Sequence, residues 1–313
     1  HLFEDVDFPE PETLFDDYTT RGPQMKTQEL TIDRHMGYAF DFKVRELKNE
    51  PTLQYIRDSW LMAMAEMDSE QRATWEAIYD KKNEEFLKNP PVGKDLLRWK
   101  YQRYVKEYCR TIRSVDEQVG RLLDYLEEKG VLDNTVIVYT SDQGFLLGEH
   151  GLYDKRFMYE ESFRTPLIIS CPSLVKKHSV CKELVQNIDL APTFLSLAGV
   201  EVPKEMSGRS LLPLFKNGKA ENWRNELYYH FYDYPAVGSV RKHDGIRTKR
   251  YKLIHWYGEG SGNDEAIDFW ELYDLKKDVM EVNNVYDNPK YVKVREVLTV
   301  QLEKLRKDVG VTE

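Results

Sequence analysis

The sequence has few cysteines, no long apolar run and no excess of basic residues. Three cysteines in 313 residues are too few for a disulfide framework; Cys171 and Cys181 could close one small loop, and Cys109 is predicted to be a buried free thiol. No apolar run approaches the ~20 residues that cross a bilayer, so no membrane span is expected. Lys and Arg number 45 against 54 Asp and Glu, a net charge of −9, which argues against nucleic acid as the main partner. A bound divalent cation can reverse the local field, so an anionic substrate stays compatible with this charge.

Hydrophobic periodicity indicates an α/β fold. Hydrophobic residues make up 41% of the chain, enough for one large core or two smaller ones. Apolar residues spaced three and four apart predict helices over residues 52–67, 69–88, 94–129 and 289–308. Short β-branched or alternating runs predict strands over residues 135–140, 166–170, 180–187, 226–232, 246–255 and 270–275. The helix over 94–129 and the strand after it form half of a crossover unit, so we expect that strand to be buried in a sheet.

Proline and glycine residues gather between residues 202 and 218, a composition typical of a linker. This composition predicts two units, residues 1–212 and residues 213–313. The second unit would hold an antiparallel sheet and the terminal helix. Shortly before the linker, Asp189 is predicted to cap a helix that has Pro192 in its first turn.

The strand over 135–140 ends abruptly at Ser141-Asp142-Gln143-Gly144. Ligands of open α/β sheets collect where strands end, and calcium prefers carboxylate and amide oxygens as ligands. The sequence therefore suggests a calcium site at Asp142 and Gln143, with Lys155 near enough to contact an anion held by the metal. The alternative is a turn that leaves a strand, with a solvated lysine, because turns also favour Asp and Gly.

These residues belong to a longer ordered pattern, Thr140 to Gly144, Gly148-Glu149-His150-Gly151, Asp154-Lys155-Arg156 and Arg164-Thr165-Pro166-Leu167. The pattern resembles the second metal-binding segment of the type I sulfatases, in the alkaline-phosphatase-like superfamily. It is most similar to bacterial glycan sulfatases of the N-acetylglucosamine-6-sulfatase and iduronate-2-sulfatase type. The resemblance implies an α/β core with a mixed sheet flanked by helices, and a small C-terminal α+β subdomain with an antiparallel sheet.

The same resemblance implies a function and a set of residues. It implies hydrolysis of sulfate esters on sulfated carbohydrate, with Asp142 and Gln143 as Ca²⁺ ligands and Lys155 as the catalytic contact to the sulfate. It also implies a periplasmic or secreted protein. Further contacts to the sugar are expected from His150, Asp154, Arg156, His230 and His243. For these the alternatives are a role in orienting the loop, pairing of Arg156 with Glu160 or Glu161, and a solvated strand edge.

Two other features bear on the catalytic machinery. Asp16-Asp17 resembles a sulfatase metal pair but follows no predicted strand, so we interpret it as structural. The sequence contains no Cys/Ser-x-Pro/Ala-x-Arg motif, the source of the formylglycine nucleophile in sulfatases. The chain therefore resembles the C-terminal portion of a sulfatase, and we expect the formylglycine and the first metal pair in an N-terminal portion of a longer parent.

Three functions compete at this stage. The first is a glycan sulfatase that is inactive without the N-terminal portion of its parent. The second is a phosphate or phosphonate monoester hydrolase of the same superfamily. The third is a non-catalytic remnant that binds glycans. The choice of Gln rather than His beside Asp142 favours calcium and sulfate over a two-metal phosphatase site.

Overall fold

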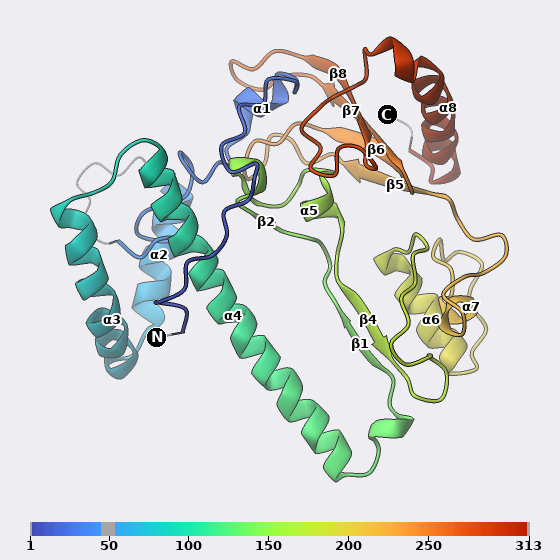
Figure 1. The fold of residues 1–313 in the computed structure, drawn as a ribbon, viewed down its shortest axis with the longest axis horizontal. Coiled ribbons are helices and arrows are strands. Elements are labelled where there is room, and N and C mark those ends of the chain that lie inside the picture. The colour runs from blue at the N-terminus through green and yellow to red at the C-terminus, as the bar shows by residue number, and fades with distance from the viewer. Residues whose placement is uncertain (1, 45–53, 312–313) are drawn as a thin grey trace.

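A computed structural model describes residues 2–44 and 54–311 of the chain and shows a mixed α/β architecture (Figure 1). The helices are α1 Gln24–Thr27, α2 Gln54–Glu66, α3 Ser69–Lys88, α4 Lys94–Glu128, α5 Glu160–Phe163, α6 Leu190–Leu197, α7 Leu212–Phe215 and α8 Val292–Asp308, with 3₁₀ turns η1 Leu132–Asn134, η2 Glu149–Gly151, η3 Asn187–Asp189 and η4 Pro289–Tyr291. The strands are β1 Ile137–Thr140, β2 Leu146–Leu147, β3 Tyr153–Asp154, β4 Leu167–Ser170, β5 Glu226–Phe231, β6 His243–Thr248, β7 Tyr251–Gly258 and β8 Ile267–Asp274. The predicted fold class is confirmed.

The long helix α4 follows its predicted bounds but is only partly covered. Its first half buries Tyr101 and Val105 against Leu14 of the N-terminal segment. The same apolar stripe continues to Ile112 and Leu122, where the side chains are exposed, Leu122 by 56%. Figure 1 shows this second half extending away from the other helices. Of the helix predicted over residues 52–67, residues 52 and 53 lie outside the described part.

The strand that precedes Asp142 has a single neighbour among the described residues. β1 pairs antiparallel with β4, with Ile137 opposite Ser170. Apolar side chains on this ribbon are exposed, Ile168 by 64%, so the prediction of a strand buried in a sheet is wrong for these residues. α4 also does not cover the ribbon (Figure 1), because the two elements diverge from the turn η1 that joins them.

The strand predicted over residues 180–187 is also wrong. Val180 is 78% exposed, and the segment pairs with no strand in the part of the chain that the structure describes. Side-chain contacts hold it instead: Trp223 Nε1 donates to Leu184 O at 2.8 Å, and the backbone N–H of Gln186 donates to Asp189. Of the apolar residues in this segment, Val185 packs against the cluster of Leu211, Leu214 and Phe215 at α7.

Asp189 lies at the start of α6, as predicted, but its side chain does not cap that helix. The buried carboxylate accepts from the backbone N–H groups of Gln186 and Arg209, both at 2.8 Å, and forms an ion pair with Arg224. Asp189 therefore ties α6 to the segment that follows it, which a cap could not do. The division of the chain at residue 212 stays a prediction.

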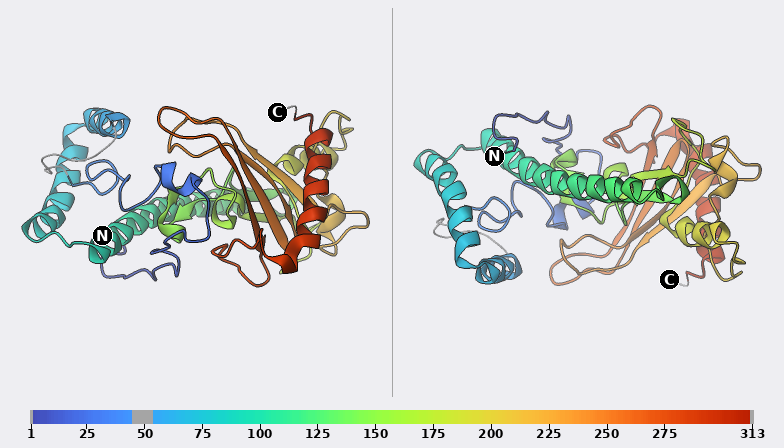
Figure 2. Two further views of the ribbon diagram at one scale, coloured as in Figure 1. Left: turned by 90° about the horizontal axis from the view of Figure 1, so that it is seen from above. Right: turned by 90° about the horizontal axis from the view of Figure 1, so that it is seen from below.

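The C-terminal part forms a four-stranded antiparallel sheet in the order β5-β6-β7-β8. Helix α8 lies against one face of the sheet, as Figure 2 shows from above and below. Its Leu298 and Leu302 belong to the buried cluster at that face. The opposite face meets the aromatic core around Phe157 and Tyr159. Val297, which was predicted to face inward, is exposed.

One predicted strand, over residues 246–255, is in fact two. β6 ends at Thr248 and β7 begins at Tyr251, with a turn at Lys249 and Arg250. The turn contains neither glycine nor proline, so the sequence carried no signal for it.

Candidate functional site

The predicted metal pair lies directly after β1, where the two strands of the ribbon end. Asp142 is exposed and Gln143 is half-buried, and both line a cleft bounded by β4, α7 and β5. Among the described residues, the Asp142 carboxylate accepts from its two sequence neighbours alone, the backbone N–H of Gln143 at 3.1 Å and the hydroxyl of Ser141 at 3.3 Å. The carboxylate therefore keeps lone pairs that these two contacts do not use.

Gly144 fixes the metal pair to α5. Its backbone N–H donates to Ser162 O at 2.8 Å. A Cβ added at Gly144 would lie 2.1 Å from the backbone oxygen of Glu161, well inside contact distance. The Asp-Gln-Gly sequence therefore needs its glycine for close packing, and not only for a turn.

Replacing Gly144 with Ala should destabilise the protein by about 1–3 kcal/mol, because the backbone of α5 or of the site loop must move. The measurement is the free energy of unfolding in denaturant. Gly120→Ala is the matched control, since Gly120 lies within α4 with no atom near the added Cβ. That control should be neutral or stabilising by up to ~1 kcal/mol. Equal stability of the two variants would contradict the close contact.

The donor chemistry of this loop fits a hard cation but supplies only part of its shell. Calcium takes 6–8 oxygen ligands. Across residues 2–44 and 54–311, no group of three or more His, Cys, Asp or Glu side chains is placed to hold a metal ion. Asp142 and Gln143 together offer one carboxylate and one amide oxygen, so the rest of the shell would have to come from elsewhere.

Lys155 lies on a second loop, immediately after β3. β2 and β3 form a short hairpin, with Leu146 opposite Asp154. Lys155 is half-buried and makes no ion pair within the described ranges, so its ammonium is available to an anion. The cleft lined by Asp142 and Gln143 does not include Lys155, and the joint action of the three residues stays a prediction.

The two residues that flank Lys155 contact each other. Asp154 and Arg156 form an ion pair, and both are half-buried. Arg156 does not pair with Glu160, the alternative from the sequence, because Glu160 is held by Arg247 at 3.0 Å and Lys252 at 2.9 Å. A sugar contact by Asp154 or Arg156 would have to compete with this pair.

Two of the predicted sugar contacts, His150 and His243, have no exposed surface. The ring of His243 lies 4.0 Å from that of Trp256, and its Nδ1 is 2.9 Å from Arg241 O. Burial lowers the pKa of His243 to about 4, so the ring is neutral at physiological pH and donates from Nδ1 to that carbonyl. We therefore interpret His243 as part of the core of the C-terminal sheet; the sequence offered no sign of its burial.

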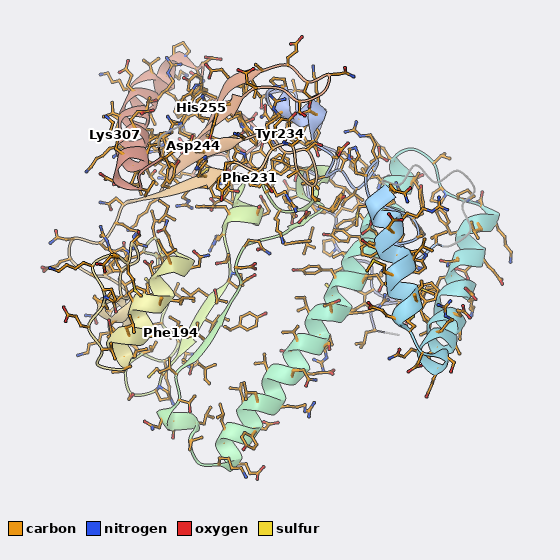
Figure 3. The ribbon with its side chains drawn as sticks, turned by 180° about the vertical axis from the view of Figure 1, so that it is seen from behind. Phe194, Phe231, Tyr234, Asp244, His255 and Lys307 are labelled. Atoms are coloured by element: carbon orange, nitrogen blue, oxygen red, sulfur yellow. The ribbon has the colours of Figure 1, made fainter. Side chains whose placement is uncertain are left out.

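His230 is half-buried, and its Nε2 lies 2.6 Å from the hydroxyl of Tyr257. The neighbouring Asp244 is buried and accepts from the Arg306 guanidinium of α8, beside His255 (Figure 3). In the basic and aromatic cluster of this region, His243 and Arg241 are buried, whereas His230 is partly exposed and Tyr232 is 66% exposed. The role of His230 in binding sugar stays a prediction.

The sequence did not indicate a buried cluster of charged residues between α5 and the C-terminal sheet. Lys252 has no exposed surface and forms ion pairs with Glu160 at 2.9 Å and Glu281 at 2.7 Å. Burial disfavours the ionised form of Glu160, but Lys252 and Arg247 outweigh it and lower the pKa to about 2. For Glu281 burial dominates and raises the pKa to about 7, despite Lys252.

Asp16 is structural, as the sequence suggested. It is largely buried and forms an ion pair with Arg21 at 2.8 Å, whereas Asp17 is exposed and accepts from Thr19. All three cysteines are free thiols, Cys109 being half-buried rather than buried. In the described ranges no helix combines the length and the apolar character needed to cross a bilayer.

An oxygen-donor pair at a strand end with a lysine loop beyond it is an arrangement typical of the alkaline-phosphatase-like superfamily. Comparison with family models identifies the family within this superfamily. The model described as sulfatase matches residues 11–200, and the model described as N-sulphoglucosamine sulphohydrolase, C-terminal, matches residues 148–308. The chain belongs to the sulfatase family, whose members are sulfuric ester hydrolases, as the sequence pattern predicted.

Individual relatives agree. The chain is 45% identical over 308 residues to an N-acetylglucosamine-6-O-sulfatase of Bacteroides thetaiotaomicron, covering 98% of this chain and 54% of the relative. Human N-acetylglucosamine-6-sulfatase is 40% identical over 124 residues, which is 39% of this chain and 22% of that protein. The structure of BT4656 in complex with its substrate D-glucosamine-2-N,6-O-disulfate matches with a TM-score of 0.88 at 44% identity, covering 97% of this chain and 60% of that one. Almost all of this chain is thus matched by the Bacteroides thetaiotaomicron relative, but the chain spans only about half of that relative's length.

Proposed function

We propose that this chain is part of a sulfatase that removes sulfate from glycans containing sulfated glucosamine. The observation that carries the proposal is the oxygen-donor pair after β1, set in a chain that is 45% identical over 98% of its length to an N-acetylglucosamine-6-O-sulfatase. The BT4656 structure was obtained with a sulfated glucosamine as substrate, which supports the choice of sugar. The family resemblance adds a periplasmic or secreted location.

The residues of this chain have distinct roles in the proposed reaction. Asp142 and Gln143 would hold Ca²⁺ through a carboxylate and an amide oxygen. The cation, when bound, supplies Lewis-acid polarisation of a sulfate oxygen. Lys155 would bring its compact positive charge to the sulfate and stabilise negative charge as the ester bond breaks. The formylglycine nucleophile and the first metal pair would come from the N-terminal portion of the parent.

Exposed apolar surface supports the partnership with that portion. The outer stripe of α4, including Ile112, Val115 and Leu122, and the ribbon residues Tyr139 and Ile168 are exposed in this chain. Exposed apolar surface on neighbouring elements marks a site of contact with further polypeptide. We propose that the N-terminal portion of the parent packs here, and that residues 1–313 alone are inactive.

A second candidate is hydrolysis of phosphonate or phosphate monoesters. The phosphonate monoester hydrolase SpPMH of Silicibacter pomeroyi matches with a TM-score of 0.58 at 25% identity over 71% of this chain. The amide at Gln143 argues for a single hard cation and thus for the sulfatase. Parallel assays of sulfate and phosphonate esters distinguish the two.

The test compares the full-length protein with residues 1–313 alone. The full-length protein should release sulfate from glucosamine-6-sulfate and bind calcium with micromolar affinity or better. Residues 1–313 alone should release none and bind calcium more weakly, because two oxygen donors leave most of the shell to water. Ion chromatography of sulfate and isothermal titration of calcium give the readouts.

Within the full-length protein, Asp142→Asn should weaken calcium binding and abolish sulfate release together. Asp133→Asn is the matched control, because Asp133 is an exposed carboxylate in η1, one turn before β1. Micromolar calcium binding and sulfate release by residues 1–313 alone would refute the proposed division of the site.

A further inference from the structure

The N-terminal segment of residues 13–32 runs beside the loop that leads to Lys155. It forms hydrogen bonds with both the backbone N–H and the backbone carbonyl of His150 in that loop. The backbone N–H of His150 donates to the Thr13 hydroxyl at 2.9 Å, and the Tyr18 hydroxyl donates to His150 O at 2.6 Å. His150 has a φ of +55°, a left-handed conformation that is costly for a residue other than glycine. These two hydrogen bonds support that conformation.

The same segment continues along the loop toward Lys155. The backbone N–H of Ile32 donates to Gly151 O, and that of Tyr153 donates to Leu30 O, both at 3.0 Å. Thr31 and Leu152 form an isolated β-bridge. The loop therefore pairs with the N-terminal segment, as two extended strands do, up to the start of β3.

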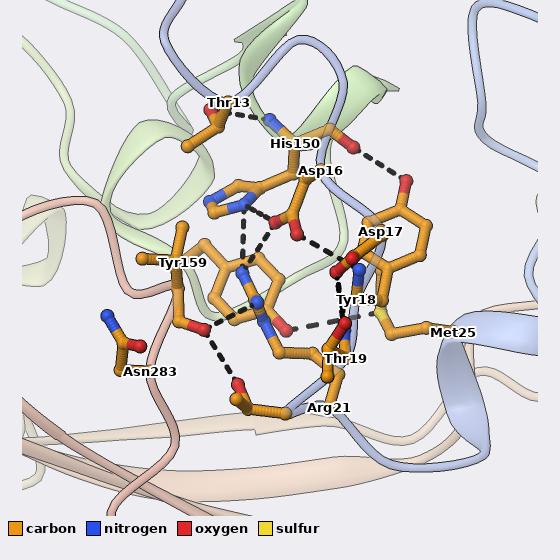
Figure 4. Close-up of polar contacts among 12 residues, drawn as sticks. Thr13, Asp16, Asp17, Tyr18, Thr19, Arg21, Met25, His150, Tyr159 and Asn283 are labelled. Carbon is orange, nitrogen blue, oxygen red and sulfur yellow. Dashed lines mark hydrogen bonds and ion pairs between the residues drawn. The ribbon is translucent and has the colours of Figure 1, made fainter.

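Asp16 and Arg21 hold the imidazole of His150, as Figure 4 shows. Asp16 Oδ2 lies 2.8 Å from His150 Nδ1 and 2.8 Å from Arg21 Nη2, and Arg21 Nη2 lies 3.0 Å from the same Nδ1. Nδ1 carries either a proton or a lone pair. With the proton, Nδ1 and Arg21 both donate to the carboxylate; without it, a lone pair would face a carboxylate 2.8 Å away. The shorter contact to the carboxylate therefore favours the Nδ1–H form over a form in which Nδ1 accepts from Arg21.

Apart from the Tyr159 ring, whose centroid lies 5.0 Å from that of the imidazole, no further contact that fixes the ring is found within the described ranges. His150 Nε2 is buried and has no hydrogen-bond partner there. Arg21 is anchored from the opposite side, because its Nη1 donates to Val282 O at 2.8 Å in the C-terminal part. Burial favours the neutral form of Asp16, but the hydrogen bond from His150 and the charge of Arg21 outweigh it and lower its pKa.

Lys155 sits between two buried anchors. On one side are His150 and Leu152, and on the other are Phe157, Met158 and Tyr159, all without exposed surface. We propose that Asp16 and Arg21 are positioning residues for Lys155: they lock His150 in the Nδ1–H form and so hold the loop that presents the ammonium. The inference rests on the proposed function of Lys155, but the lock itself is measurable without activity.

The first readout is the tautomer of His150 in the full-length protein. It is measured by ¹⁵N NMR of labelled histidine at a pH where the ring is neutral. The wild type should carry the proton on Nδ1. In Asp16→Asn the carboxylate charge is gone, so Arg21 donates to Nδ1 and the proton should move to Nε2. Asp17→Asn, a neighbouring exposed acid, is the matched control and should leave the tautomer unchanged.

The second readout is amide hydrogen exchange at His150, Gly151 and Leu152. Exchange there should be at least tenfold faster in Asp16→Asn than in Asp17→Asn. If Asp16→Asn does not fold, Arg21→Lys serves instead, since a lysine cannot bond Asp16 and Val282 O together and should accelerate exchange to a smaller degree. A tautomer and exchange rates equal to those of Asp17→Asn would overturn the proposal.

The third readout separates this inference from the proposed function. With sulfatase activity present, Asp16→Asn should lower kcat at least tenfold and leave KM within twofold. Loss of activity in Lys155→Ala with full kcat in Asp16→Asn would overturn the positioning role and leave the sulfatase standing. Absence of sulfate release from the wild type would refute the sulfatase, and the role for Lys155 with it, while the tautomer and exchange data would still decide whether Asp16 locks the loop.

Discussion

Lys155→Ala in the full-length protein should lower kcat for sulfate release by about 10²–10³-fold, the usual effect of removing one group that stabilises charge in a transition state. Unfolding free energy should change by no more than about 0.5 kcal/mol, because Lys155 makes no ion pair with any described residue. The combination matters, since a loss of activity with intact stability is the mark of a residue that acts on the substrate. Steady-state kinetics and denaturant unfolding supply the two values.

Lys219→Ala is the matched control, because Lys219 is an exposed lysine beyond α7. It should change neither value. Lys155→Arg tests whether a point charge is needed; a planar guanidinium should restore only part of the rate. Unchanged turnover in Lys155→Ala would remove Lys155 from the site and leave only the metal pair as an assigned part of it.

Lys252→Met should destabilise the protein by about 3–5 kcal/mol, the cost of leaving buried carboxylates without their counter-charge. Glu160 keeps Arg247, but Glu281 loses the only ion-pair partner that it has within the described ranges. The pKa of Glu281 is already raised to about 7 and should rise further without Lys252. The carboxyl is therefore protonated and neutral at pH 5.5. The loss should therefore be smaller at pH 5.5 than at pH 8.

The double variant Lys252→Met, Glu281→Leu should recover much of that loss, because an apolar pair of similar volume removes the uncompensated charge. Lys249→Met is the matched control: its ion pair with Glu183 has the lysine 48% exposed and should be worth less than about 1 kcal/mol. A double variant as unstable as Lys252→Met alone would mean that Lys252 acts through packing rather than through charge.

Periodicity over long segments predicted the fold best. α4 and α8 were found from apolar residues three and four apart, because a helix keeps one face in contact over many turns. The sequence predicted the burial of short elements less well. The run before Asp142 looks like a buried strand because its residues are β-branched, yet its burial depends on neighbouring strands that a local pattern cannot show.

The residues of the candidate site likewise fall into those that the sequence indicated and those that it missed. Asp142, Gln143 and Lys155 lie close together in sequence and form an ordered motif, so the sequence indicated them. Lys252 and Arg21 were missed because their partners lie far away in the chain; a buried lysine between Tyr251 and Leu253 looks like the solvent face of an alternating strand. The burial of His243 was missed for the same reason.

The hydrogen bond from Arg21 to Val282 joins residues 261 positions apart, and the Thr20 hydroxyl bonds both Val282 O and the backbone N–H of Asn284. Contacts of such long range form late, since the loop they close must first be ordered. During synthesis the support for the Lys155 loop is therefore incomplete until residue 284 has left the ribosome. The loop would gain its full set of supporting hydrogen bonds only after the segment of residues 282–284 has been made.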